Sequence, residues 1–474
     1  MAQPTYQQLL DIIDRKDQRI AQLESQVASL QSQVERLTAQ VRQLSAQFQE
    51  ALRAGKRQAA PFSKGPPKDH PKPPGRKAGP KYGPKAHRPI PDQPPDEIID
   101  VPLPDACPNC GGPTTEDHTA EQYQTDIPRQ PIIRRFDLHI GHCCRCGKRI
   151  QPRHPLQTSD ALGAAASQLG PDAQAAIVHL NKHGGLSCGK IGFYFQTTYG
   201  ITITPGGVCQ AMLRAGRRGE WLYQHILASV PKAPWIVPDE TGWRVGGRGG
   251  WMFGAVTPTA TIYLVSGHRG YDTAIQIIPP DYAGTMIHDG FSPYNKFVFA
   301  AHQQCLDHLN RRCKELLETA VAGAARFPRQ VRQLLGDALA LRDRRDAGQL
   351  SAHGLAVAIG RLASRLDALL CWTRTHADNE RLAKHLDNHC DELFTFLKVP
   401  GIDATNYRAE RAMRLAATIR KIWGGNRTIR GAKAQSILMT ILATGRQLAL
   451  DTFRLFADLL CGHRVRLPLR PAGP

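Results

Sequence analysis

The chain has 474 residues, a hydrophobic fraction of 41% and a formal net charge of +20. This length predicts several domains, and the charge favours a polyanionic partner, nucleic acid ahead of an anionic membrane surface. No apolar run approaches the roughly 20 residues of a membrane span, and the N-terminus lacks a signal-peptide pattern. We therefore expect a cytoplasmic protein whose 12 cysteines are metal ligands or buried side chains rather than disulfides.

Residues 1–53 carry a heptad repeat in which β-branched residues at position a alternate with leucines at position d. Its members are Ile13, Ile20, Val27, Val34 and Val41 at a, and Leu23, Leu30, Leu37 and Leu44 at d. This pattern favours a parallel two-stranded coiled coil and therefore a homodimer. The alternative is an amphipathic helix packed on its own globule.

Residues 54–98 are rich in proline and glycine, interleaved with lysines and arginines. Such a composition cannot bury a core and predicts an extended basic linker. A solvated spacer and a non-specific phosphate-binding arm explain it equally well.

Two Cys-x-x-Cys knuckles, each followed by glycine, predict a zinc ribbon over residues 99–155. The first holds Cys107 and Cys110, the second Cys143 and Cys146, with strand-like sequence between them. Zn²⁺ prefers four tetrahedral thiolates, and four sulfurs leave no open position, so we expect a structural site. Cys144 competes with Cys143 as the ligand.

A helical pattern over residues 156–232 contains a candidate helix-turn-helix DNA-binding domain. A helix over 186–196 is followed by a turn, and Thr204-Pro205 then predicts the start of a helix that runs through Leu213. Ordinary helical packing explains this pattern about as well.

Residues 233–302 read as strands. A short strand at 235–237 leads to Asp239 before a turn at Gly242, and a strand at 285–288 leads to Asp289 before Gly290. Between them, segments 250–256 and 261–265 predict a hairpin. Residues 303–400 read as helices that begin with one over 303–318.

Two final helices, over 405–420 and 434–449, lie within residues 401–462, and residues 463–474 form a tail. Glu410 lies on the first of these helices. Two aspartates at strand ends and a glutamate on a later helix are typical of a site that holds a pair of Mg²⁺ ions for phosphoryl transfer. Taken singly, each aspartate is more typical of a turn residue than of a metal ligand.

Three other residues near these carboxylates need an interpretation. Glu240 should point to the opposite face of its strand from Asp239. Cys305 and His308 lie one helical turn apart, and with only two ligands visible we interpret them as a packing pair rather than a metal site.

The chain resembles transposases of the bacterial insertion sequence 66 family, the TnpC-type DDE transposases, from the coiled coil to about Leu460. The most specific blocks are Glu410-Arg411-Ala-Met-Arg414, Arg420-Lys421, Gly424-Gly425-Asn426-Arg427 and Gly431-Ala432. Asp239-Glu240-Thr241, Asp289-Gly290 and Gln304-Cys305 match other blocks. Where the family often has two asparagines before the Glu-Arg pair, this chain reads Asp403-Ala-Thr-Asn406-Tyr.

This resemblance implies an RNase H-like α/β core, first part over 233–302 and last part over 401–462, with a helical insertion within 303–400. It implies a catalytic triad of Asp239, Asp289 and Glu410 that binds two Mg²⁺ ions, with Mn²⁺ as a substitute. The whole chain is thus predicted to be multidomain α+β, with an N-terminal coiled coil, a zinc ribbon and a helical DNA-binding region before the core.

The implied activity is that of a DNA transposase that cleaves the 3′ ends of its element and joins them to target DNA. We expect the basic residues after Glu410 to hold the DNA backbone, although a solvated face is the alternative: Arg411, Arg414, Arg420, Lys421 and Arg427. Expected partners are element and target DNA, a second copy of the chain and accessory proteins of the same element, in the bacterial cytoplasm at the nucleoid. The rival interpretations are a non-catalytic sequence-specific DNA-binding regulator or degenerate transposase, and a zinc-ribbon scaffold.

Overall fold

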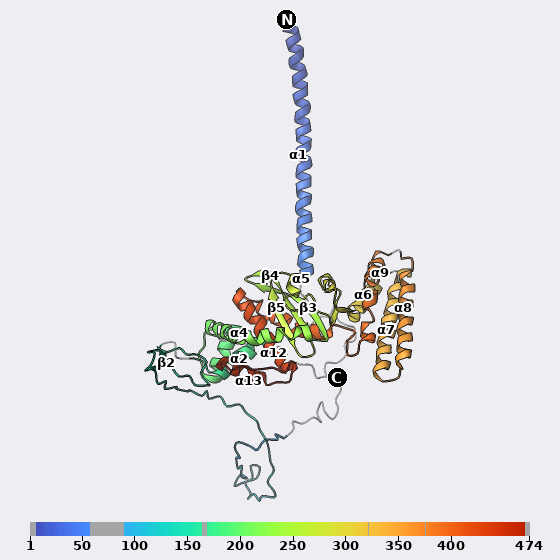
Figure 1. Cartoon of the computed structure of the whole chain (residues 1–474). Coiled ribbons are helices and arrows are strands. Elements are labelled where there is room, and N and C mark those ends of the chain that lie inside the picture. Colours follow the sequence, from blue (N-terminus) through green and yellow to red (C-terminus); the bar gives the residue numbers. More distant parts are fainter. Residues whose placement is uncertain (1–5, 57–89, 164–167, 321, 375, 470–474) are drawn as a thin grey trace. The chain divides into compact units, whose positions relative to one another are not determined.

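The computed structural model describes residues 6–56, 90–163, 168–320, 322–374 and 376–469 (Figure 1). The chain divides into two compact units, Met1–Thr125 and Asp126–Pro474. Residues 57–89 of the predicted linker and 470–474 of the predicted tail lie outside the described residues.

The first unit contains the helix α1 (Tyr6–Lys56), which confirms the helix predicted from the heptads. Its apolar stripe is uncovered: the side chains at described a and d positions from Ile20 to Leu44 are between 44% and 63% exposed. Residues 90–125 form no helix, and their best-defined feature is a turn at Cys107–Gly112, closed by a bridge between Ala106 and Pro113.

The second unit begins with a mostly extended segment whose only strands within residues 126–163 are β1 (Gly141–His142) and β2 (Arg149–Ile150), paired antiparallel. The strand-like sequence predicted between the knuckles forms no strand over 132–140. Ile132 and Ile133 are 73% and 93% exposed, so no buried apolar surface holds this segment in a sheet.

Three helices follow: α2 (Pro171–Lys182), α3 (Cys188–Tyr199) and α4 (Pro205–Leu227). The predicted cap of α4 is confirmed, since the Thr204 hydroxyl accepts a hydrogen bond from the Gly207 N–H at 3.1 Å. The predicted end at Leu213 is wrong because the buried face continues through Leu222 and Ile226, so the helix runs to Leu227.

A five-stranded mixed sheet forms the centre of the second unit, in the order β5-β4-β3-β6-β7. β3 (Trp235–Val245), β4 (Arg248–Val256) and β5 (Thr261–Ser266) form an antiparallel meander. β6 (Thr285–His288) and β7 (Ala301–Gln304) run parallel to β3. Helices pack against this sheet, as the predicted α+β class requires (Figure 1).

β3 is much longer than predicted, and the expected turn at Gly242 is wrong. Asp239 lies in mid-strand, and Gly242 is a paired strand residue opposite Trp251. The chain turns instead at Gly246-Gly247, whose φ angles of +59° and +79° suit the tight hairpin that two consecutive glycines permit.

β7 replaces the start of a predicted helix. The helix expected from Gln303 begins only at Leu306, as α6 (Leu306–Thr319). Gln303 and Gln304 are buried, and the Gln303 carboxamide accepts a hydrogen bond from the Phe396 N–H at 2.8 Å. A strand of buried glutamines, in which the Gln303 carboxamide bonds to backbone groups of a distant segment, carries no apolar alternation for a sequence pattern to detect.

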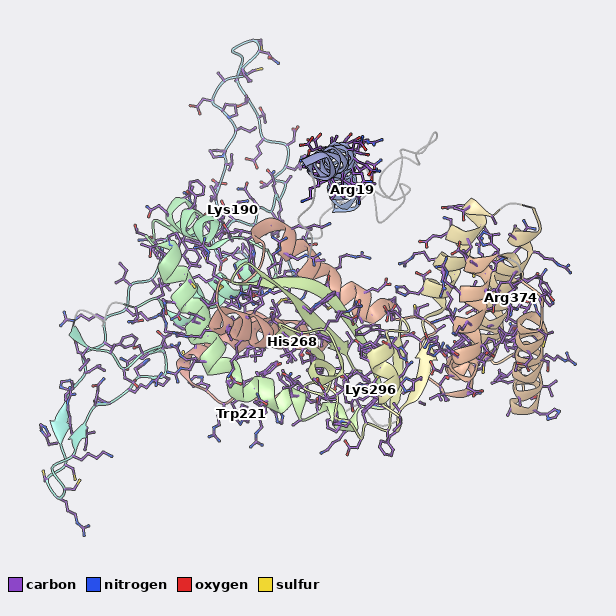
Figure 2. All side chains as sticks on the ribbon, turned by 90° about the horizontal axis from the view of Figure 1, so that it is seen from above. Arg19, Lys190, Trp221, His268, Lys296 and Arg374 are labelled. Carbon is purple, nitrogen blue, oxygen red and sulfur yellow. The ribbon has the colours of Figure 1, made fainter. Side chains whose placement is uncertain are left out.

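The helices after α6 form a group whose hydrophobic core continues onto α6 and onto sheet residues such as Val237 and Ile287. They are α7 (Arg326–Asp346), α8 (Ala352–Leu370), α9 (Ala377–Asn388) and the short α10 (Thr395–Lys398). Their shared core includes Leu334, Leu366 and Leu386. Figure 1 shows α7, α8 and α9 side by side, and Figure 2 shows Arg374 among these helices and His268 beside the sheet. Short helical turns lie at Val230–Lys232, Tyr271–Ala274, Ser292–Lys296, Ala322–Ala325 and Cys390–Glu392.

The two predicted final helices are confirmed as α11 (Tyr407–Trp423) and α12 (Ile429–Gln447), and an unpredicted α13 (Thr452–Cys461) follows. Asp451 caps α13 by accepting hydrogen bonds from the N–H groups of Phe453 and Arg454. None of the helices in the described part of the chain is long and apolar enough to cross a membrane.

Candidate active site

The strand register places Asp239 and Asp289 at the same level of the sheet. β3 and β6 pair in parallel with Ile236 opposite Met286. Asp239 lies three residues beyond Ile236, and Asp289 lies three residues beyond Met286. Since neighbouring strands are about 4.8 Å apart and matched positions share a face, the two carboxylates lie close together at the carboxyl end of the parallel pair.

Glu410 reaches the same region from α11. Gly254 on β4 is the direct cross-strand partner of Asp239. A Cβ at Gly254 would lie 2.3 Å from the Met413 sulfur, so the missing side chain lets α11 pack directly on the sheet there. Glu410 precedes Met413 by one helical turn on the same side of α11 and therefore lies beside Asp239.

The pKa of Asp239 reflects the presence of other carboxylates nearby. Burial, followed by the charges of Glu240, Asp289 and Glu410, raises the pKa of Asp239 to about 7. Carboxylates that oppose one another's ionisation in a partly buried site are typical of cation binding, and their oxygens suit a hard divalent ion. Among the described residues, no three His, Cys, Asp or Glu side chains already surround one point closely enough to hold a metal ion.

Glu240 is held on the other face of β3 by two partners. Its side chain is 3% exposed and accepts hydrogen bonds from Arg269 at 2.6 Å and from the Tyr294 hydroxyl at 2.8 Å. Burial raises the pKa of Glu240, and the hydrogen bonds from Arg269 and Tyr294 oppose that shift. Because its oxygens are engaged by Arg269 and Tyr294, Glu240 is a structural carboxylate.

Glu410 has basic neighbours on α6. His308 Nε2 and Arg311 Nη2 lie 3.6 Å and 3.8 Å from its Oε1. The Cys305 sulfur accepts a hydrogen bond from the Asn406 N–H at 3.4 Å and is buried, so Cys305 joins α6 to the start of α11 while His308 faces Glu410. The buried Asn406 Oδ1 has no hydrogen-bond partner among the described residues.

Histidines behind Asp289 were not anticipated from the sequence. The Gly290 N–H donates to His288 Nδ1 at 3.1 Å, which leaves His288 Nε2–H to donate to His302 Nδ1 at 2.9 Å. His302 Nε2–H then donates to the Phe297 carbonyl at 3.0 Å. Burial lowers the pKa of His288 to about 3, so His288 is neutral and its Nδ1 can accept the Gly290 N–H, which holds the Asp289-Gly290 turn.

The predicted DNA-contacting residues fall into two groups. Arg411, Arg414, Lys421 and Arg427 are exposed on α11 and the loop after it. Arg420 is half-buried, and its guanidinium donates to the Gly242 carbonyl and to the Thr241 hydroxyl at 3.4 Å. Arg420 therefore ties α11 to β3, whereas the other four present their charges to solvent.

The first cysteine knuckle is a compact turn. The Cys107 N–H donates to the Gly112 carbonyl, and the Gly111 N–H donates to the Cys107 carbonyl, each at 2.8 Å. Hydrogen bonds from the backbone N–H groups of Asn109 and Cys110 lower the pKa of the Cys107 thiol. This turn therefore favours the thiolate form that binds metal.

The second knuckle repeats the pattern. The Cys143 N–H donates to the Lys148 carbonyl at 2.9 Å, and the Gly147 N–H donates to the Cys143 carbonyl at 2.8 Å. Backbone N–H groups of Cys146 and Arg145 lower the pKa of Cys143. Cys143 thus occupies the position of Cys107 in the first turn.

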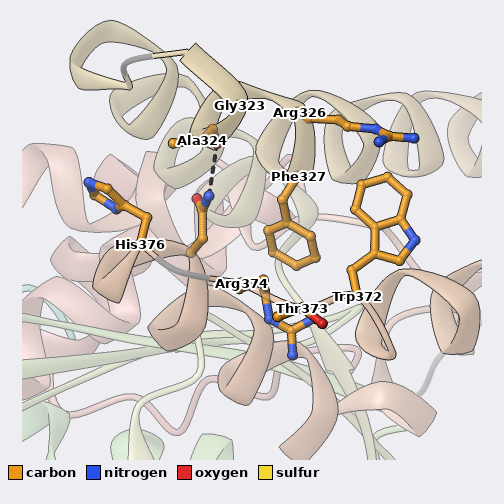
Figure 3. Close-up of a pocket in the computed structure, with 9 residues that line it drawn as sticks. Gly323, Ala324, Arg326, Phe327, Trp372, Thr373, Arg374 and His376 are labelled. Carbon is orange, nitrogen blue, oxygen red and sulfur yellow. Dashed lines mark hydrogen bonds between the residues drawn. The ribbon is translucent and has the colours of Figure 1, made fainter.

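A cavity of about 500 Å³ lies in the helical group, apart from these carboxylates. Figure 3 shows Arg326 over the Trp372 indole, and the guanidinium carbon lies 4.7 Å from the ring centre. The Asn379 side chain donates to the Ala324 carbonyl at 2.8 Å. No carboxylate lines this cavity, so its chemistry differs from that of the Asp239 site.

A five-stranded mixed sheet that brings two aspartates together and receives a glutamate from a packed helix is consistent with an RNase H-like polynucleotidyl transferase core. Residues 166–434, more than half of the chain, match the family described as Transposase IS66 family, and the chain belongs to it. The protein is therefore a DDE transposase, which acts on DNA and is of a class that typically uses divalent metal ions. No curated protein matches the chain.

Proposed function

We propose that Asp239, Asp289 and Glu410 are the catalytic triad and bind two Mg²⁺ ions, with Mn²⁺ able to replace them. The observation that carries this proposal is the matched register of Asp239 and Asp289, with Glu410 close enough to raise the pKa of Asp239. When bound, such ions activate the attacking oxygen and stabilise the leaving oxygen.

The free carboxylate oxygens support these roles. Asp239 Oδ1 accepts the Glu240 N–H at 2.9 Å and Asp289 Oδ1 accepts the Phe291 N–H at 3.0 Å, so each carboxylate is oriented by its own backbone. The second oxygen of each remains available for an ion. His308 Nε2 and the Arg311 guanidinium lie beside Glu410, and the positive charge of Arg311 offsets that of the carboxylate.

The proposed reaction is two in-line attacks at phosphorus without a covalent protein intermediate. In the first, a water oxygen forms a bond to phosphorus as the bond to the 3′ oxygen of the element end breaks. In the second, that 3′-hydroxyl attacks a phosphorus of target DNA and releases a target 3′-hydroxyl. The phosphate backbone would be held by four exposed basic residues, Arg411, Arg414, Lys421 and Arg427. Arg420 would contact DNA as well as donating to the Gly242 carbonyl.

The other parts are proposed to bring this site to DNA. The uncovered stripe of α1 supports a parallel homodimer, which would hold two element ends together. The hydrogen-bonded turn within each knuckle supports the proposal that Cys107, Cys110, Cys143 and Cys146 bind structural Zn²⁺. Residues 156–232 would contact DNA, the helices within 303–400 would be an insertion, and accessory proteins of the element would assist in the bacterial cytoplasm.

The test is strand transfer in vitro with Mg²⁺, the element's own ends and its accessory proteins. Wild type is compared with Asp239→Ala, Asp289→Ala and Glu410→Ala, and with Asp281→Ala as an exposed control. We expect all three triad variants to lose detectable joining while they still bind DNA. Joining by any of them would remove that residue from the triad, and wild-type binding without cleavage would favour a non-catalytic regulator.

A further inference from the structure

A histidine of the helical group covers the turn that carries Asp289. Gly290 has a φ of +89°, and a Cβ there would lie 3.0 Å from Cε1 and 3.5 Å from Nε2 of His385, on α9. Glycine is therefore required at this position both for its backbone conformation and for the approach of the imidazole. This contact joins two segments almost 100 residues apart in the sequence.

His385 differs from the other histidines around it. His288 and His302 bond to each other, and His389 Nδ1 bonds to Glu392 at 2.9 Å. The His385 ring packs against His389, with centroids 4.7 Å apart. Within the described chain neither ring nitrogen of His385 has a hydrogen-bond partner, so both remain available to a ligand.

The environment of His385 keeps it neutral. Burial, with smaller contributions from His389 and Arg312, lowers its pKa to about 4, against the opposing charges of Glu392 and Asp289. A neutral imidazole has one N–H donor and one acceptor nitrogen. Beside a carboxylate pair, such a side chain can donate to an anion without forming a competing ion pair with Asp289.

We propose that His385 is an active-site residue that donates a hydrogen bond to a non-bridging oxygen of the DNA phosphate held beside Asp289. This inference rests on the proposed function of the Asp239, Asp289 and Glu410 site. It follows from position: the imidazole faces the Asp289-Gly290 turn, it has no partner within the described chain, and the reaction brings an anionic oxygen there. The helices after β7 would then supply part of the chemistry as well as covering the sheet.

The competing explanation is that His385 only packs over Gly290. Substitution separates the two, because Gln keeps an N–H donor of similar reach, whereas Phe and Leu keep only bulk. His385→Gln, His385→Phe and His385→Leu are compared with His353→Gln, a change at an exposed histidine of α8. The assay joins a duplex with a free 3′-hydroxyl element end to target plasmid, with Mg²⁺ and the accessory proteins, and records joining rate, DNA affinity and melting temperature.

We expect His385→Phe and His385→Leu to join about 100-fold more slowly at unchanged DNA affinity, as removal of one donor to a developing charge does elsewhere. His385→Gln should retain most of the rate, and His353→Gln should match wild type. Rates are compared well below the lowest melting temperature, so lost stability does not hide the ranking.

Wild-type rates for the Phe or Leu variant, or an equal loss for Gln, would overturn the inference. If the inference about His385 failed but wild type joined DNA and the Asp239→Ala variant did not, the proposed function would still stand. An inactive wild type, or an active Asp239→Ala variant, would remove the proposed function and this inference with it.

Discussion

Asp239 lies in mid-strand, where burial and the charges of Glu240, Asp289 and Glu410 all oppose its ionisation. Its pKa rises from 3.8 to about 7, so the folded protein holds a proton that the unfolded chain releases. The stabilisation from this bound proton is complete below pH 3.8 and is lost as the pH rises through 7. In the metal-free protein at pH 8, Asp239 is therefore a destabilising charge.

Asp239→Asn should accordingly raise the free energy of unfolding of the metal-free protein, by up to about 4 kcal/mol at pH 8. The gain should be smaller at pH 5, where Asp239 is protonated in the folded protein. Urea unfolding at the two pH values measures this change in the free energy of unfolding. The control is Asp281→Asn, a substitution at an exposed carboxylate. Mg²⁺ should stabilise wild type but not the variant, and an equal Mg²⁺ effect on both would contradict metal binding by Asp239.

At the scale of elements, the open edge of β5 is covered by a ladder of hydroxyl groups on α12. Ser436, Thr440 and Thr444 recur every fourth residue, and their oxygens accept the N–H groups of Val265, Tyr263 and Thr261 at 2.9, 2.8 and 3.1 Å. The hydroxyl groups along α12 and the amides along β5 have similar spacings, because four helical residues rise about 6 Å and two strand residues rise about 6.8 Å. This ladder satisfies edge amides that would otherwise be buried without partners.

Thr440→Val should destabilise the protein by about 1–3 kcal/mol, because it leaves the buried Tyr263 N–H without an acceptor while it conserves volume. Thr418→Val on α11 is the matched control, since that exposed hydroxyl bonds only to its own helix at Arg414. Chemical denaturation at neutral pH measures both changes. Equal, small effects of the two substitutions would show that the ladder contributes nothing beyond helix packing.

The sequence patterns predicted those elements whose signal is local. β6 and the helix with Glu410 were predicted because each carries its own apolar pattern. β7 was missed because its buried glutamines are satisfied by segments about 90 residues away. The end of β3 differs from the prediction because a glycine after a short strand favours a turn, whereas Gly242 pairs with Trp251 and leaves room for the Arg420 guanidinium.

The residues of the candidate site also divide into those with a local sequence signal and those that depend on tertiary contacts. Asp239 and Asp289 were visible as strand residues, since each follows an apolar run in the sequence. His302 and His385 carried no signal, because their relation to Asp289 depends on tertiary contacts between β6, β7 and α9. Side chains that support a site from distant segments become apparent only once the chain has folded.

At the scale of the whole molecule, metal binding by the knuckles can be tested separately from catalysis. Cys143 matches Cys107 in hydrogen-bonding pattern, whereas Cys144 follows it and takes the place of Pro108. The purified chain should contain about one zinc ion, given four thiolate ligands. Elemental analysis should find it retained in Cys144→Ser and lost or weakened in Cys143→Ser, and the reverse ranking would show that the assignment of the ligand is wrong.

The state of assembly depends on α1, whose apolar stripe the described part of its own unit leaves exposed. We expect the full chain to be a dimer in sedimentation experiments at micromolar concentration, because heptads with β-branched residues at a and leucine at d favour two parallel strands. Replacing Leu30 and Leu37 by Asp should give monomers, since each dimer would bury four carboxylates in the seam. The same charges at Ser32 and Ala39, outside the seam, should leave the dimer intact.

The two double variants also separate dimerisation from chemistry. A Leu30→Asp, Leu37→Asp chain keeps the Asp239 site, so it should still bind a single element end while it fails to join two ends together to one target. The Ser32→Asp, Ala39→Asp chain carries the same added charge and should join paired ends as wild type does. A monomeric wild type, or paired-end joining by the seam variant, would assign α1 to another role and place the pairing of DNA ends elsewhere in the chain.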